Sequence, residues 1–121
     1  MTTLTVPGTA AVRAGAADML RTGGWIQGRY YSESPTTPGF DLVGAISLAA
    51  GLPVTELACV KPSSTDPGYL ARWDVAQQVC AEIAAVLGRP KDEASPPRWL
   101  AFWNDRATLV DVLGALEGQA A

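Results

Sequence analysis

The segment at residues 69–87 constrains the fold of this chain more than any other part of the sequence. Its apolar side chains recur at three- and four-residue spacing, which places them on one face of an α-helix. They are Leu70, Trp73, Ala76, Val79, Cys80, Ile83 and Leu87. Gly88 and Pro90 follow, and both residue types end helices. The pattern therefore predicts one long amphipathic helix whose apolar face lies in a core.

Shorter helical patterns occupy much of the remaining chain. We predict helices at residues 9–21, 40–51, 57–60 and 96–102, and another that begins after Thr108. Thr9 and Asp41 stand near the starts of the first two, and both are residue types that cap helix N-termini. Thr108 and Asp111 have the spacing of a capping box, in which each side chain accepts a hydrogen bond from the other residue's backbone.

The segment at residues 25–31 has a different character. Its aromatic and β-branched residues favour extended backbone, and Gly28 indicates a local irregularity. We therefore predict one short β-hairpin near residues 25–31. Residues 32–39 combine prolines, a glycine and hydroxyl side chains, which predicts a surface loop that can cover a pocket. Together these patterns predict a mainly α fold, a compact single-domain helical bundle spanning residues 1–121.

Composition and charge limit the partners of such a domain. With 121 residues, of which 48% are hydrophobic, the chain can bury one core and has no obvious second domain. Its net charge is −3, and its nine Lys and Arg residues are scattered, so we expect neither nucleic acid nor a membrane as partner. The N-terminal sequence lacks the basic and apolar regions of a signal peptide. We therefore expect a cytoplasmic protein.

Several kinds of site chemistry have no support in the sequence. The chain contains no histidine, which excludes imidazole-based mechanisms and the usual zinc sites. Its two cysteines, Cys59 and Cys80, do not form a CxxC pair, and we do not expect a disulfide in a reducing compartment. No glycine-rich phosphate loop with a following lysine occurs. We expect neither a metal nor a cofactor.

Two carboxylates are candidates for proton transfer. Asp41 lies between Phe40 and Leu42 at the start of an apolar helix, where burial would raise its pKa. Asp105 lies next to Asn104 beside an aromatic cluster. Each has a simpler structural alternative, because Asp41 can serve as a helix N-cap and an Asn-Asp pair suits a tight turn.

Aromatic residues are the candidates for ligand binding. Trp99 and Trp103 lie close to Asn104, whose amide can hydrogen-bond a polar ligand group. Trp25 and Tyr30 belong to the segment predicted to be extended, beside a loop. We expect these side chains to edge a cleft, whereas the helical spacing of Trp73 predicts that it packs in the core.

Three short motifs carry a family resemblance. They are GWIQG at residues 24–28, FDLVGAI at residues 40–46, and WND at residues 103–105 followed by Thr108, Val112 and Leu113. In this order they resemble a DUF6197-like family of small actinobacterial and phage proteins of unknown function. The resemblance implies a compact, helix-rich cytoplasmic protein and supplies no catalytic residues. Members often have a cysteine at the position of Asp41, so any shared thiol chemistry is lost here or replaced by an acid.

Two functions follow from these features as hypotheses. The first is binding of a small apolar or aromatic molecule, with a cofactor-independent cyclisation, isomerisation or proton transfer at Asp41 or Asp105 if the protein is an enzyme. The alternative is a non-enzymatic protein-interaction module, phage-borne or regulatory, that uses an exposed aromatic patch. The C-terminal helix, rich in alanine and leucine, can also pack against a second copy in a homodimer. A concave, partly polar site would favour the first function, and a flat aromatic surface would favour the second.

Overall fold

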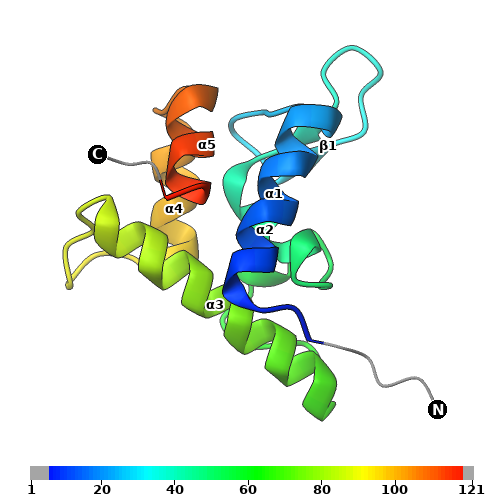
Figure 1. Ribbon diagram of the computed structural model, residues 1–121, viewed down its shortest axis with the longest axis vertical. Coiled ribbons are helices and arrows are strands. Elements are labelled where there is room, and N and C mark those ends of the chain that lie inside the picture. Colours follow the sequence, from blue (N-terminus) through cyan, green and yellow to red (C-terminus); the bar gives the residue numbers. More distant parts are fainter. Residues whose placement is uncertain (1–5, 119–121) are drawn as a thin grey trace.

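A computed structural model describes residues 6–118 of the chain, and helices dominate this part (Figure 1). It contains five α-helices, one short 3₁₀ helix and one two-stranded sheet within those residues. In chain order they are α1 (Thr9–Gly23), β1 (Tyr31–Ser32), β2 (Gly39–Phe40), α2 (Leu42–Ala49), the 3₁₀ helix η1 (Glu56–Ala58), α3 (Pro67–Val86), α4 (Pro96–Asn104) and α5 (Leu109–Leu116). The predicted mainly α, single-domain fold is confirmed.

Helix α2 lies at the centre of the core. Its residues from Leu42 to Ser47 are all buried, because this segment has almost no polar side chain that needs water. Helix α1 packs against α2, α3 and α5, and α4 packs against α2 and α3. In Figure 1, α1 (blue) stands upright at the centre beside α5 (red), and α3 (green to yellow) crosses below both.

Helix α3 confirms the strongest prediction from the sequence. Trp73, Val79 and Cys80 lie on its buried face, as the apolar spacing predicts. The helix begins at Pro67, slightly earlier than expected, because the Asp66 side chain caps it by accepting a hydrogen bond from the Tyr69 N–H at 3.1 Å.

The predicted caps of the other helices are confirmed at two of three places. The carboxylate of Asp41 caps α2, and Thr108 and Asp111 form both hydrogen bonds of a capping box at 3.1 Å. The expected N-cap of α1 is wrong. Gly8 occupies that position in extended conformation, with no capping side chain, and Thr9 is already helical.

One short hairpin is present, as predicted, but it lies further along the chain than residues 25–31, because only Tyr31 of that segment is in a strand. Strand β1 pairs antiparallel with β2, with Tyr31 opposite Phe40. Phe40 also forms a parallel bridge with Trp25. The Phe40 N–H donates to the Gly24 carbonyl, and the Ile26 N–H donates to the Phe40 carbonyl, both at 3.0 Å. The extended segment after α1 is thus held beside the start of α2.

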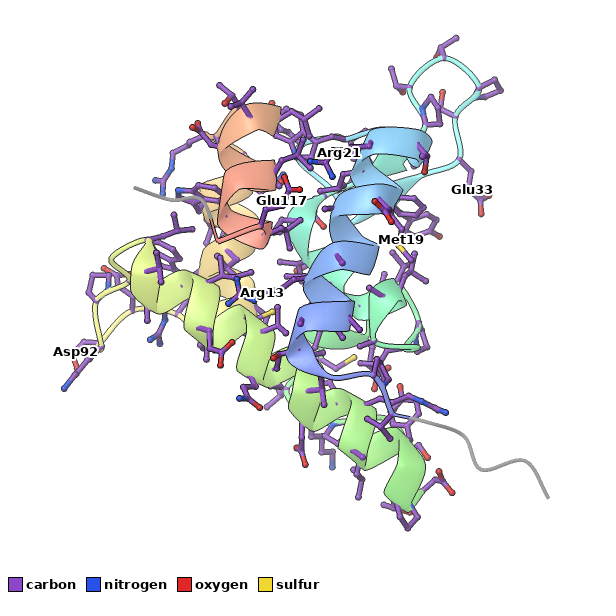
Figure 2. The ribbon with its side chains drawn as sticks, viewed as in Figure 1. Arg13, Met19, Arg21, Glu33, Asp92 and Glu117 are labelled. Atoms are coloured by element: carbon purple, nitrogen blue, oxygen red, sulfur yellow. The ribbon has the colours of Figure 1, made fainter. Side chains whose placement is uncertain are left out.

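Two ion pairs within residues 6–118 join α1 to its neighbours. Arg13 contacts Glu82 of α3 at 3.3 Å, and Arg21 contacts Glu117 just after α5 at 2.5 Å. Figure 2 shows Arg21 and Glu117 pointing toward each other between the two helices. Such exposed pairs contribute little to stability, so the apolar contacts of α1 hold the helices together.

The two cysteines lie in different environments, and neither is in a disulfide. Cys80 is completely buried in the core, as predicted, and burial raises the pKa of its thiol to about 12. Cys59 is exposed. Separately, none of the described helices combines the length and the apolar character needed to cross a membrane.

The apolar face of α5 faces inward. Val112, Ala115 and Leu116 belong to the core of this chain. The face considered for a homodimer is therefore already packed within the monomer, and a dimer remains a prediction that would need another surface.

Gly44 allows α2 to approach the chain at Tyr30 closely. A Cβ at this position would overlap the Tyr30 carbonyl oxygen and would lie 3.1 Å from Val54 Cγ2. We predict that Gly44→Ala lowers the free energy of unfolding by about 1–3 kcal/mol, measured by urea denaturation, because α2 must move.

Gly114→Ala is the matched control. It is also a glycine inside a helix, and nothing lies within 4 Å of an added Cβ. Alanine should be neutral or stabilise the protein by up to about 1 kcal/mol there, through its higher helix propensity. Equal effects of the two substitutions would contradict the proposed close contact.

Candidate functional site

The side-chain amide of Asn104, at the end of α4, lies entirely inside the protein. It is 0% exposed. Its Oδ1 accepts hydrogen bonds from Trp25 Nε1 at 2.7 Å and from the Leu42 N–H at 3.1 Å. Its Nδ2 donates to the Ile26 carbonyl at 3.0 Å. One amide thus joins three segments that are far apart in the sequence, and it meets the polar groups that each of them buries.

Further hydrogen bonds attach the segment after α1 to the end of α4. Gln27 Nε2 donates to the carbonyls of Asn104 and Ala107, both at 3.1 Å. The Gly28 N–H donates to the Asp105 carboxylate at 2.7 Å. Both polar side chains considered as ligand-binding or catalytic, Asn104 and Asp105, therefore already have partners in this chain. Their hydrogen bonds are those expected of residues that stabilise the fold.

Asp41 combines a capping role with an unusual titration. Its carboxylate is 2% exposed and accepts a hydrogen bond from the Gly44 N–H at 2.6 Å. Burial raises the pKa of Asp41 to about 7, helped by the charge of Asp105, although the N–H groups of Gly44 and Val43 act in the opposite direction. A pKa near neutrality suits a general acid or base, but a catalyst must also contact its substrate.

The predicted aromatic residues do not surround one cleft. Trp25 lines a groove beside the loop at residues 32–38, whereas Tyr30 lines a different groove between α3 and α4. Trp99 and Trp103 are half-buried against the core and line neither groove. Helical geometry explains their placement, because residues four apart on α4 share the face that packs inward.

The concavity between α3 and α4 is the more enclosed of the two grooves. We call it the α3–α4 groove, and its volume is about 660 Å³. Its lining includes Tyr30, Leu57, Cys59, Trp73, Arg98 and Phe102. They come from the chain before β1, from η1 and the turn after it, and from the two helices, so only tertiary folding brings them together.

Aromatic rings and one cation set the chemistry of this groove. The guanidinium of Arg98 lies over the Phe102 ring, 6.0 Å from its centre, as an attraction between a cation and a ring face requires. The pKa of the Tyr30 phenol is raised by burial and by the charges of Asp41 and Asp105, while Arg98 lowers it. Tyr30 therefore presents a neutral hydroxyl at neutral pH.

Arg98 and Phe102 were not among the site residues predicted from the sequence. They lie four residues apart in the segment predicted to be helical, and this spacing places a cation and a ring on one helix face. The sequence therefore allowed the pairing of Arg98 with Phe102 to be predicted. The groove itself was not predictable, because η1 and α3 form its other walls.

The second concavity is more polar. It holds about 830 Å³ and is lined by Trp25, Arg29 and hydroxyl side chains of the loop at residues 32–38. The expectation that this loop can cover a pocket fits that position. Ser34 and Thr36 hydrogen-bond each other at 3.0 Å, so part of this polar lining is already satisfied within the loop. Among the residues described, no three His, Cys, Asp or Glu side chains gather as a metal site would require.

Fold and site together define a small, mainly helical domain with a buried amide junction and an open aromatic groove. The chain belongs to the Family of unknown function (DUF6197), whose family model matches residues 5–121. The resemblance to a DUF6197-like family of unknown function is confirmed, and the actinobacterial and phage origin stays a prediction. No curated protein and no solved structure matches the chain significantly.

Replacing the Asn104 amide should destabilise the protein strongly. Asn104→Leu has a similar volume but leaves Trp25 Nε1, the Leu42 N–H and the Ile26 carbonyl without a partner. Each unsatisfied buried group costs about 1–3 kcal/mol, so we expect a loss of roughly 3–6 kcal/mol in urea denaturation.

Gln27→Ala is the control for that substitution. It also removes two hydrogen bonds at the same junction, but Gln27 is exposed and water can replace it. Its cost should stay below about 1 kcal/mol. A similar, small effect of both substitutions would show that the junction does not depend on the amide.

Removing the Asp41 charge should change how stability depends on pH. The pKa of Asp41 is about 7 in the folded protein and has an ordinary value of 3.8, so the folded state holds the proton more tightly. This contribution is fully present below roughly pH 4 and is lost as the pH rises through about 7. Asp41→Asn keeps an oxygen that can accept from Gly44 and carries no titrating proton.

We therefore predict that Asp41→Asn is the more stable protein at about pH 8, by on the order of 4 kcal/mol, and that the difference shrinks toward roughly pH 4. Urea denaturation at a series of pH values measures this. Parallel curves for the variant and the wild-type protein would refute the assignment of this titration to Asp41.

Proposed function

We propose that this protein binds a small apolar or aromatic molecule in the α3–α4 groove. The observation that carries the proposal is the convergence of three aromatic side chains, Tyr30, Trp73 and Phe102, on one concavity. Small-molecule sites are typically concave and mostly apolar, with a few placed polar groups. The volume of about 660 Å³ lies within the usual range for such sites.

The walls of this groove are suited to a planar ligand. Trp73 is held in the core and is only 9% exposed, so it offers a fixed surface. Phe102 is 54% exposed and stands on the opposing helix, where a ligand ring would remove it from water. Burial of apolar surface stabilises a complex by about 25 cal/mol per Å² before the entropic costs of association.

The position of the carboxylates favours binding over catalysis. Asp41 caps α2, Asp105 accepts from Gly28, and neither lines the groove. Proton transfer requires a group within hydrogen-bond reach of the reacting atom. The hypothesis of a cyclase or isomerase that uses these two residues therefore gains no support from their placement, and we propose a binding function.

Protein interaction is the second candidate, favoured by one observation. Val60 and Phe102 both line this groove, and they are 102% and 54% exposed. Exposed apolar side chains grouped in this way are typical of interaction surfaces. The concavity of the groove favours a small ligand. A protein companion retained in native mass spectrometry of the protein from its own host would favour the second candidate.

The proposal can be tested with N-phenyl-1-naphthylamine, a neutral aromatic probe that fluoresces more strongly in apolar surroundings. We expect saturable binding at one site. Phe102→Ala should weaken it about five- to tenfold, because one wall of the groove is lost. Val110→Ala is the matched control, since it removes an exposed apolar side chain of α5, 79% exposed, away from the groove.

Cys59 provides an independent test of location. It is exposed and lines the groove, whereas Cys80 is buried, so a bulky maleimide should label Cys59 alone. Labelling should abolish probe binding in the wild-type protein and leave it intact in Cys59→Ser. Probe binding that survives both the label and Phe102→Ala would overturn the proposal, as would the absence of saturable binding.

A further inference from the structure

Arg98 has no polar partner in the part of the chain that the structure describes. Its guanidinium makes neither a hydrogen bond nor an ion pair with any residue in the described range 6–118. Arg13 and Arg21 pair with glutamates, and Arg89 donates to the Ala94 carbonyl at 2.8 Å. Arg29, Arg72 and Arg106 also lack such partners among the described residues, but of these four arginines only Arg98 lines the α3–α4 groove. The planar set of N–H donors of Arg98 is thus available to a ligand.

The lining of the groove contains one charged side chain. Arg98 is the one cation among the residues that line the groove, and no Asp or Glu is among them. Asp41 and Asp105 act on the Tyr30 phenol, because their charges raise its pKa. Arg98 acts on the same phenol in the opposite direction. Because Arg98 is the charged side chain of the lining, an anionic group in the groove would be attracted toward it.

Two features prepare Arg98 for such a group. Its position over the Phe102 ring restrains a long side chain, so less entropy is lost when it binds. Ser95, which also lines the groove, begins α4 without using its hydroxyl as a cap. That hydroxyl can donate a second hydrogen bond to an anion held by Arg98.

We propose that the ligand of the α3–α4 groove is a small aromatic acid, with its ring between Trp73 and Phe102 and its carboxylate or sulfonate on Arg98. This inference rests on the proposed binding function and adds the chemical class of the ligand. The apolar walls supply most of the affinity, and the charged hydrogen bonds to Arg98 select acids over neutral aromatics.

The test compares two probes with the same aromatic body. 1-Anilinonaphthalene-8-sulfonate carries one sulfonate, and N-phenyl-1-naphthylamine carries none. We expect the wild-type protein to bind the sulfonate about tenfold more tightly. Arg98→Gln should remove this preference and leave the affinity for the neutral probe unchanged within about twofold. Added salt should weaken the binding of the sulfonate alone.

Arg106→Gln is the matched control. It removes the same charge from an exposed residue that does not line the groove, so the preference should remain. Near-ultraviolet circular dichroism of each variant excludes dye binding by a loosened core. Equal affinity for the two probes, or a preference that survives Arg98→Gln, would overturn the acid-binding inference while the proposed function stands. If neither probe binds in the groove, both proposals fail.

Discussion

The side-chain amide of Asn104 satisfies polar groups of Trp25, Ile26 and Leu42 in the interior of the protein. An amide suits this position because one end accepts two hydrogen bonds while the other donates. Leucine lacks both capacities, and aspartate would set an oxygen against the Ile26 carbonyl. The end of α4, the start of α2 and the extended segment after α1 therefore meet at a side chain that no apolar residue can replace without leaving buried groups unpaired.

The candidate site depends on this junction through the backbone. The segment held by Asn104 continues to Tyr30, whose carbonyl accepts from the Asp41 N–H at 3.1 Å and lies against Gly44. These contacts place Tyr30 in the lining of the α3–α4 groove and keep the Asp41 carboxylate buried. The same packing that forms the groove also raises the pKa of Asp41, so that unusual titration is a consequence of the architecture and needs no catalytic role.

Local chemistry made much of the fold predictable. The cap at Asp41 and the capping box at Thr108 depend on residues within one helical turn, and the face of α3 depends on its own periodicity. The candidate site was less predictable. Trp99 and Trp103 cluster in sequence beside Asn104, but helical geometry turns them against the core, while Arg98 and Phe102 of the same helix face the groove.

Spacing and caps act over a few residues, so the order of amino acids was enough to predict which segments form helices, where most of them begin, and that Cys80 lies in the interior. Which polar side chains hold the fold together depends instead on how the helices pack. Asn104 reaches Trp25 across 79 positions, and Arg98 is left without an acid because none of the surrounding elements brings one to it. Such pairings depend on how helices pack, and the packing arises from the whole core at once.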